Sequence, residues 1–199
     1  MLLPLRIASL AILLSATPAI AQDDTSNDAE EAVSEQPVQL SDETLEGLFK
    51  RLAEADERQA SRIEDEITER WSKSGSDSAD LLLIRGRKAM RKKEFKKAAA
   101  HFSRLIAFRP DFAEGWNARA TAHFADKNLG RALADLYEAL RLEPRHFGAL
   151  IGIALIMESL DRKDDAYAAF KAAQDLHPNV DGAKAGLERL RESVEGEPI

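Results

Sequence analysis

Three proline residues stand 34 positions apart and divide much of the chain into equal segments. Pro110, Pro144 and Pro178 close the consecutive segments 79–112, 113–146 and 147–180. Small and apolar residues recur at fixed offsets in these segments: Gly86, Ala120 and Ala154; Ala98, Ala132 and Ala166; Phe102, Leu136 and Phe170; and Leu105, Ala139 and Ala173. This period is typical of a solenoid of helix–turn–helix units. The sequence therefore predicts an all-α fold of a kind that usually binds other molecules and rarely catalyses reactions.

Composition narrows the function classes further. The chain of 199 residues has no cysteine, which excludes disulfides, thiol catalysis, thiolate metal sites and lipid attachment through cysteine. Aromatic residues make up only 6% of the chain, and its alanine and leucine content favours helices over strands. The net charge of -7 argues against a nucleic-acid partner.

The N-terminal segment 1–21 resembles an export signal. Arg6 precedes an apolar run over residues 7–14, and Ala19-Ile20-Ala21 gives a small-x-small cleavage pattern before Gln22. The alternative is an uncleaved membrane anchor, but the run is shorter than the ~20 residues that span a bilayer. We predict cleavage of the signal peptide 1–21 by a Sec-type route and a periplasmic location, with secretion beyond the cell as the second interpretation.

The rest of the chain divides into short segments around the repeats. Residues 22–40 are acidic and polar and predict a disordered linker. Residues 41–78 predict a helical hairpin that is a degenerate repeat or an N-terminal cap, its first helix capped by Ser41 or Asp42 and its second covering about 56–73. Helices are expected at 79–92, 95–108, 113–126, 129–142, 147–160 and 163–176, followed by a capping helix at 181–194 and a frayed tail at 195–199.

The repeated unit resembles the tetratricopeptide repeat (TPR). The residues that carry the resemblance are Gly86, Ala98, Phe102 and Pro110 in the first repeat, Trp116, Ala120, Ala132, Ala139 and Pro144 in the second, and Ala166, Phe170, Ala173 and Pro178 in the third. The usual tyrosine of the first helix is replaced by Ala89, His123 and Met157. Together with the export signal, the resemblance is to exported periplasmic TPR proteins of Gram-negative bacteria, which implies a scaffold or adaptor.

The resemblance also implies a concave groove, lined by the first helix of each repeat, that takes an extended peptide or a partner helix. The groove positions carried over are Asp80, Leu83, Arg87, Met90 and Arg91; Glu114, Asn117, Thr121, Phe124 and Ala125; and Gly148, Ile151, Leu155, Glu158 and Ser159. We expect the apolar members to hold apolar partner side chains, and Arg87 and Arg91 to pair with a partner carboxylate. The alternative is that the N-terminal hairpin or the final helix covers part of this groove.

Some TPR proteins grip chaperone tails with a clamp of lysine and asparagine residues. The resemblance places three clamp positions at Leu83, Arg87 and Ala118, and none of them carries a clamp residue. Binding of chaperone tails is therefore not expected.

A dense basic run follows the start of the first repeat. Cationic side chains dominate the segment 85–97, which contains Arg85, Arg87, Lys88, Arg91, Lys92, Lys93, Lys96 and Lys97. This run predicts contact with an anionic surface, either lipid, glycan or acidic protein. Two alternatives are a merely solvated turn and screening by the acidic stretch 22–46, which has nine Asp or Glu residues and no basic residue.

Catalysis has little support, because the four histidines are scattered and no phosphate loop or nucleophile elbow is present. We therefore predict no enzymatic activity and no cofactor, but an adaptor for envelope proteins that supports cell-envelope assembly or integrity. Two alternatives remain open: a regulator of an envelope enzyme, such as a peptidoglycan hydrolase or a cytochrome assembly factor, and an exported factor that acts on a host. The sequence does not identify the partner or the oligomeric state.

Overall fold

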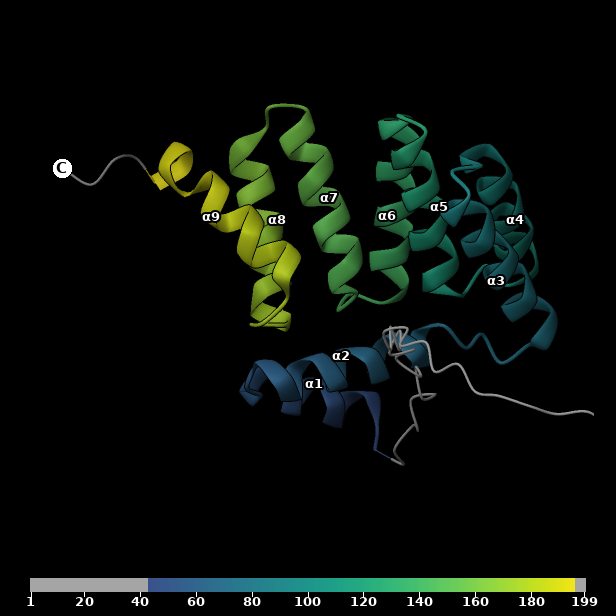
Figure 1. Ribbon diagram of the computed structural model, residues 1–199, viewed down its shortest axis with the longest axis horizontal. Helices are drawn as coiled ribbons and strands as arrows, with labels where there is room; N and C mark the ends of the chain where they lie inside the picture. The colour runs from purple at the N-terminus through teal and green to yellow at the C-terminus, as the bar shows by residue number, and fades with distance from the viewer. Residues whose placement is uncertain (1–42, 196–199) are drawn as a thin grey trace, which may run out of the picture. The chain divides into compact units, whose positions relative to one another are not determined.

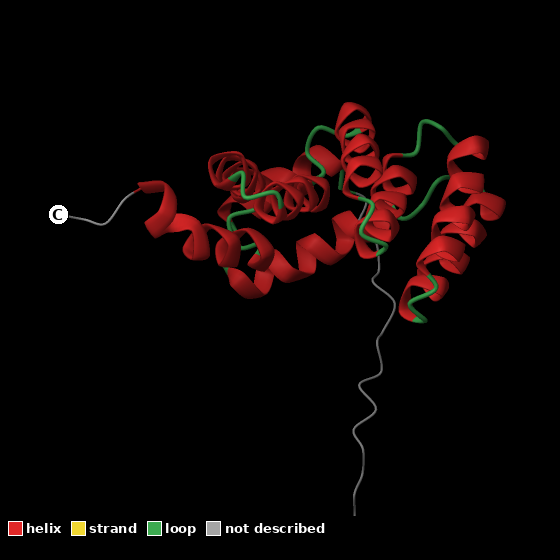
Figure 2. Ribbon diagram, turned by 90° about the horizontal axis from the view of Figure 1, so that it is seen from above, coloured by secondary structure: helices red, strands yellow, loops and turns green. Residues whose placement is uncertain are grey.

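The computed structural model describes residues 43–195, and within that range every regular element is a helix (Figure 1). The helices are α1 (Leu45–Glu54), α2 (Glu57–Trp71), α3 (Asp77–Arg91), α4 (Phe95–Phe108), α5 (Ala113–Ala125), α6 (Leu129–Leu142), α7 (Phe147–Ser159), α8 (Lys163–Leu176) and α9 (Asp181–Glu195). Short loops join them (Figure 2). The predicted all-α solenoid is confirmed, while the predicted signal 1–21, the linker 22–40 and residues 196–199 lie outside the described residues.

Each repeat is an antiparallel helix pair, and the small residues of the repeat pattern lie at its core. Ala98, Ala132 and Ala166 are all fully buried. Phe102 and Phe170 are buried beside them. Because an alanine side chain lets two helices approach closely, the larger rings can fill the remaining space without leaving cavities. Helices α3, α5 and α7 are the first helices of the three repeats, and α4, α6 and α8 are the second.

The turn inside each repeat has the same backbone geometry. Lys93, Lys127 and Asp161, which occupy equivalent positions of the three repeats, have φ values of 59°, 62° and 57°. In the first turn, the Lys93 N–H donates to the carbonyl of Met90, and the next N–H donates to the carbonyl of Ala89. This is the Schellman arrangement that ends many helices, usually with glycine at the left-handed position. The chain has lysine or aspartate there instead, and so stores local strain.

The N-terminal hairpin of α1 and α2 lies against the loops that join the repeats. Trp71 at the end of α2 stacks on the His146 ring, with centroids 4.3 Å apart, and also contacts Phe147. The Glu64 carboxylate lies 2.9 Å from Nε2 of His177, and Arg145 pairs with Glu46 at 2.7 Å. The hairpin therefore spans the ends of the second and third repeats, where the chain passes from one repeat to the next (Figure 1).

The two helices of the hairpin begin at polar caps. The Thr44 hydroxyl accepts a hydrogen bond from the Gly47 N–H at 3.1 Å, so the first cap is Thr44 and not the predicted Ser41 or Asp42. The Asp56 carboxylate accepts from the Gln59 N–H at 2.9 Å and begins α2 in the same way. A side-chain oxygen placed here satisfies an N–H that has no partner inside the helix.

Candidate functional site

Two adjoining hollows lie on the face formed by the first helices of the repeats. The apolar hollow, about 170 Å³ in volume, lies between α5 and α7 and is lined by Asn117, Ala120, Thr121, Phe124, Leu136, Gly148, Ile151, Gly152, Leu155 and Ile156. The mixed hollow, about 340 Å³, lies between α3 and α5 and is lined by Arg87, Met90, Arg91, Phe102, Glu114, Asn117, Ala118 and Thr121. Because Asn117 and Thr121 line both, the two hollows adjoin, and we refer to them together as the groove.

The repeat period accounts for the way the groove is lined. Arg87, Thr121 and Leu155 are equivalent positions of the three repeats and occupy the same place on α3, α5 and α7. The three side chains point to the same side of their helices. This equivalent position is therefore a cation in the first repeat, a hydroxyl in the second and an apolar side chain in the third. The polarity of the groove therefore changes from charged near α3 to apolar near α7.

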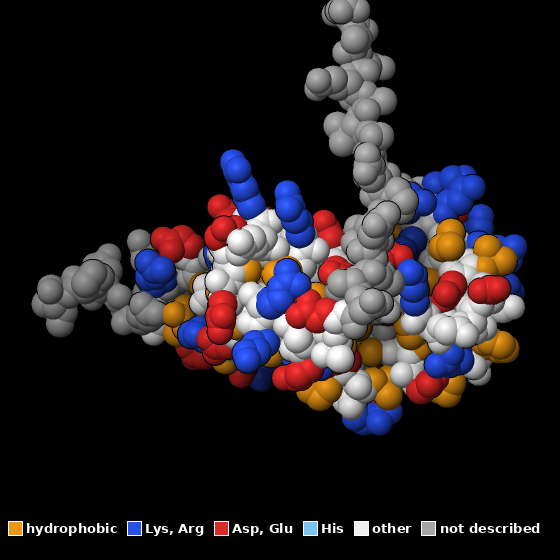
Figure 3. All heavy atoms as spheres, turned by 90° about the horizontal axis from the view of Figure 1, so that it is seen from below, with side chains coloured by type: hydrophobic (Ala, Val, Ile, Leu, Met, Phe, Trp, Pro, Cys, Tyr) orange, Lys and Arg blue, Asp and Glu red, His pale blue; other side chains and the backbone are white. Residues whose placement is uncertain are grey.

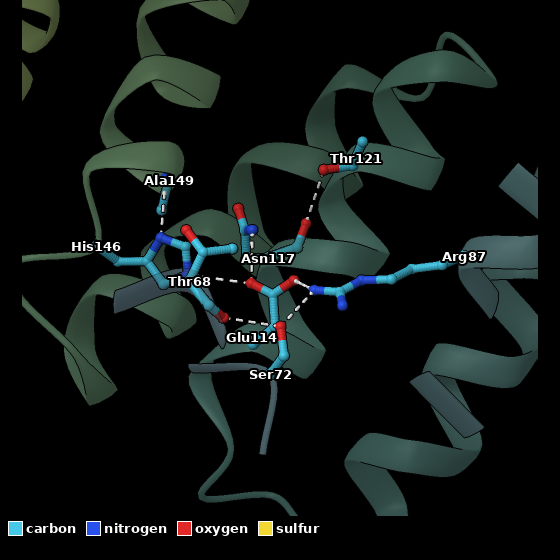
Figure 4. Close-up of polar contacts among 8 residues, drawn as sticks. All are labelled: Thr68, Ser72, Arg87, Glu114, Asn117, Thr121, His146 and Ala149. Atoms are coloured by element: carbon cyan, nitrogen blue, oxygen red, sulfur yellow. Dashed lines mark hydrogen bonds and ion pairs between the residues drawn. The ribbon is translucent and has the colours of Figure 1, made fainter. Parts of the chain in front are cut away.

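Glu114 lies at the centre of a polar cluster in the mixed hollow (Figure 4). Its Oε1 accepts a hydrogen bond from Arg87 at 2.8 Å, and its Oε2 accepts one from the Asn117 amide at 3.0 Å. The Nε2 atom of His146 lies 3.2 Å from the same Oε2. Since Nδ1 of His146 accepts from the Ala149 N–H at 3.2 Å, the tautomer with its proton on Nε2 can donate to Glu114.

The Glu114 carboxyl is held ionised by its neighbours. Burial is the largest single influence on its pKa and acts to raise it. The contacts with His146, foremost its hydrogen bond, together with the charge of Arg87 and the Asn117 hydrogen bond, outweigh burial and place the pKa of Glu114 below its ordinary value. A buried carboxylate with three partners positions the surrounding side chains, because removing any partner would leave buried charge unsatisfied.

The two arginines predicted to bind a partner carboxylate differ in their availability. Arg87 is already bonded to Glu114 and also donates to the Ser72 hydroxyl at 2.9 Å, which links α3 to the end of α2. Arg91 is exposed and makes no ion pair with any side chain that the structure describes. Arg91 is thus the free cation of the mixed hollow, and Arg87 is a structural one.

Most of the predicted groove residues line the two hollows, but Leu83 does not. The side chains of Met90, Asn117, Thr121, Phe124, Ile151 and Leu155 all line them, together with both arginines. Leu83 is only 1% exposed and belongs to a buried cluster that includes Phe102 and Leu105, so its assignment to the groove surface is wrong. The leucine side chain is apolar throughout and is stabilised by leaving water for this core.

Other carried-over positions have structural partners. Asp80 accepts hydrogen bonds from the backbone N–H and hydroxyl of Ser74 at 2.8 and 2.5 Å, and so holds the loop before α3. Glu158 forms a two-bond pair with Arg189 of α9, at 2.6 and 2.7 Å. The final helix is therefore attached beside the α7 end of the groove, while Leu155 remains 38% exposed.

The structure distributes the basic run over different surfaces. Arg85, Lys88, Lys92 and Lys97 line a hollow of about 270 Å³ with Glu94 and His101. Lys96 lines a separate hollow between α4 and α6, and Lys93 occupies the left-handed turn. Figure 3 shows Lys and Arg side chains gathered at the end of the molecule formed by α3 and α4. The run is thus several surfaces, of which the one on α3 and the start of α4 is the most concentrated.

Two further properties concern the described part of the chain alone. Between residues 43 and 195 there is no group of three or more His, Asp or Glu side chains that could hold a metal ion. No helix in this range combines the length and apolar character needed to cross a membrane.

The sequence comparisons point to one group of proteins. No model of a protein family matches the chain. A TPR repeat-containing protein of Rhizobium etli is 35% identical over 153 residues, which are 76% of this chain and 75% of that protein. Small glutamine-rich tetratricopeptide repeat-containing protein 2 of Saccharomyces cerevisiae is 25% identical over 135 residues, 68% of this chain but only 38% of the yeast protein.

Solved structures with the same fold are TPR domains. The TPR domain of Arabidopsis OM64 superimposes with a TM-score of 0.58 at 24% identity, over 59% of this chain and 98% of that one. The first TPR domain of Spaghetti (RPAP3), bound to the HSP90 peptide SRMEEVD, gives 0.58 at 20% identity, over 61% of this chain and 96% of that one. At these identities the likeness concerns the fold.

Proposed function

Because this chain belongs to the family of TPR repeat-containing proteins, we propose that it is a non-enzymatic adaptor that holds a segment of an envelope protein in its groove. TPR domains typically mediate contacts between proteins and are not catalysts. The proposal rests on one observation: the apolar hollow and the mixed hollow adjoin on one face, with Asn117 and Thr121 lining both. One extended or helical segment can therefore fill both.

The two hollows define the chemistry of that segment. Phe124, Ile151 and Leu155 offer apolar surface that a partner's aliphatic or aromatic side chain would cover, and such anchors carry most of the energy of an interface. Arg91, which lies at the charged end, can hold a carboxylate through two parallel hydrogen bonds. The expected ligand is therefore a segment with an apolar anchor followed by an acidic residue or chain end.

This ligand differs from the chaperone tails bound by some of the structural neighbours. The RPAP3 domain is bound to an HSP90 peptide, and the TPR2B domain of yeast Sti1 is in complex with an Hsp70 peptide. In the present chain, Leu83 is buried and Arg87 is held by Glu114, at two positions where the resemblance places clamp residues. An apolar anchor in the hollow beside α7 is better supported than a clamp for two carboxylates.

The proposed setting of this adaptor is the periplasm, where it would support assembly or integrity of the cell envelope. The support is the pattern of residues 1–21: a positive charge, an apolar run and the small-x-small site before Gln22. Expression of the full chain in a Gram-negative host, followed by fractionation and N-terminal sequencing, tests this part. We expect a periplasmic product that begins at Gln22; a cytoplasmic product that keeps Met1 would contradict it.

The groove is tested by capture from envelope fractions with the chain from Gln22 onward. The test variant is Leu155→Glu, which places a charge on the rim of the apolar hollow. The matched control is Leu160→Glu, because Leu160 ends the same helix, is 50% exposed and lines neither hollow. A partner that is lost with Leu155→Glu and kept with Leu160→Glu supports the proposal. Partners kept by both variants would exclude the groove.

The charged end needs its own pair of variants. Arg91→Glu reverses the free cation of the mixed hollow, whereas Arg85→Glu makes the same change on α3 at a residue outside that hollow. We expect only Arg91→Glu to weaken capture of the same partner. Arg87→Glu is unsuitable, because it would place a second carboxylate beside Glu114 and disturb folding.

A further inference from the structure

The first repeat exposes large apolar side chains on α3 and α4. Leu81 is 45% exposed, Ile84 58% and Phe108 57%. Beside them, Arg85, Lys88, Lys92 and Lys97 surround one hollow. We name these seven residues the open end face. A terminal repeat usually needs a polar outer surface for solubility, so exposed apolar side chains at this end indicate a surface that contacts another molecule or segment.

The equivalent residues of the second and third repeats show what this face would contact inside a longer stack of repeats. Leu81 corresponds to Gly115 in the second repeat and to Ala149 in the third, and both counterparts are buried. A Cβ atom on Gly115 would lie 3.4 Å from Leu105 of α4, the second helix of the preceding repeat. In the same way, Gly152 of α7, the counterpart of Ile84, faces Leu136 of α6. Leu81 and Ile84 therefore occupy the positions that pack on a preceding helix, and no described helix packs on them.

The N-terminal hairpin does not fill that position. Its helices pack on each other, on α8 and on the loops between repeats, and between residues 43 and 195 no element covers Leu81 or Ile84. By contrast, α9 packs on α8 at the other end of the solenoid. The hairpin precedes the first repeat in sequence but not in the stack.

The charges of the face indicate which kind of helix would fit. Arg119, the counterpart of Arg85, is neutralised by two bonds to Asp135, at 2.7 and 2.8 Å. The counterpart of Asp135 in the first repeat is His101, so Arg85 lacks the carboxylate that neutralises Arg119. Lys97 is paired with Glu94, which lines the same hollow, at 3.0 Å, whereas neither Lys88 nor Lys92 makes an ion pair with any described residue. The pKa of His101 lies below its ordinary value because of burial and of the nearby charges of Arg104, Arg85 and Lys97.

We propose that the open end face binds an amphipathic helix of another protein, with an apolar stripe on Leu81 and Ile84 and acidic residues facing Arg85, Lys88 and Lys92. The partner helix extends the solenoid by taking the place of the second helix of a preceding repeat. Apolar anchors supply the affinity, and Arg85, Lys88 and Lys92, which have no ion pair with a described residue, select acidic helices over basic ones. This site is separate from the groove, and its test does not depend on the proposed function.

The test uses a fluorescein-labelled peptide of about 20 residues, long enough to be partly helical alone, with a leucine and alanine stripe flanked by glutamates. A second peptide replaces every glutamate with lysine. Binding to the chain from Gln22 onward is measured by fluorescence anisotropy, with Ile84→Glu as the test variant and Leu160→Glu as the control. We expect the acidic peptide to bind, the lysine peptide not to bind, and Ile84→Glu alone to weaken binding by about tenfold or more, as expected for one interface anchor.

Four results would overturn the proposal. Equal binding of both peptides would show that the cations do not select the partner, and binding unaffected by Ile84→Glu would place it elsewhere. If sedimentation shows a dimer that Ile84→Glu dissociates, the occupant is a second copy of this chain. If the acidic peptide binds only after residues 22–40 are removed, the face belongs to the acidic segment of the chain itself.

Discussion

At the C-terminal end of the repeats, α9 lies on α8, with Gly186 against the Phe170 ring and Arg189 paired with Glu158 of α7. At the N-terminal end, α3 presents Leu81 and Ile84 to solvent, and the hairpin that precedes it in sequence is used elsewhere. The two ends have the same repeat unit, so their difference comes from the segment that adjoins each end in the chain. A solenoid is covered only where a neighbouring segment has a matching apolar stripe.

The largest expected effect on stability distinguishes the buried Phe170 from the exposed Phe108. Phe170→Ala should lower the free energy of unfolding by about 3–5 kcal/mol, because it leaves a cavity beneath α9. Phe108→Ala, at the open end, should change it by no more than about 0.5 kcal/mol, because that ring is largely hydrated already. Urea denaturation of both variants measures the two values. Similar losses would mean that Phe108 is buried in solution, against the description of an open end.

A smaller effect tests how tightly α9 is seated. A side chain at Gly186 would overlap the Phe170 ring, so Gly186→Ala should destabilise the protein by about 1–3 kcal/mol. Gly130→Ala is the control, because no atom lies within 4 Å of the added carbon and alanine favours a helix by up to about 1 kcal/mol. Thermal melting should shift in opposite directions for the two variants. A shift in the same direction would show that α9 moves aside without cost.

The same substitution can be made in the turn of the first repeat and in the turn of the third, and it compares the stability of the two ends of the solenoid. Lys93→Gly and Asp161→Gly each remove a side chain from left-handed backbone, which should stabilise the turn by about 0.5–1 kcal/mol. If the open end frays before the rest unfolds, the gain at Lys93 will contribute less to global unfolding than the gain at Asp161. Native-state hydrogen exchange of α3 and α8 tests the same difference. Equal gains and equal protection would show that the repeats unfold as one unit.

The smallest effect concerns pH. The hydrogen bond from Arg189, together with its charge, outweighs burial and lowers the pKa of Glu158 from its ordinary 4.5. Since the folded pKa is the lower one, this stabilisation is present above about pH 4.5 and is lost as the pH falls through the folded value. Glu158→Gln should cost at most about 1 kcal/mol at pH 7, and the cost should shrink toward pH 3. A cost that did not change with pH would assign the effect to packing.

Much of the fold could be predicted from the sequence because the repeats are local and periodic. The predicted helices 95–108, 129–142 and 163–176 agree with α4, α6 and α8 at both ends. The position of the hairpin could not be predicted, because it depends on pairs such as Glu64 with His177, which are 113 residues apart and follow no period. Nothing local to either residue indicates the other.

The groove, too, could be predicted from the sequence only in part. The repeat register places Arg91, Phe124 and Leu155 on the correct face, since equivalent positions on repeated helices face the same way. It could not show that Arg87 is engaged, because its partner Glu114 is 27 residues away in another repeat. The register also places Glu114 in the groove, but without a role. Its signal is a carboxylate in the first turn of a helix, which is too common to identify a buried network.

The hairpin has a mechanical consequence for the groove. It contacts the loops that follow α6 and α8, and the segment after it holds Arg87 and Arg109 of the first repeat through Ser72 and Ser74. A stack of helix pairs without such contacts can change its curvature, since each pair contacts only its neighbours. Here the hairpin and the segment that follows it contact all three repeats, so they fix the curvature of the groove in the absence of a ligand. A segment bound as proposed would then lose little affinity to reshaping the protein.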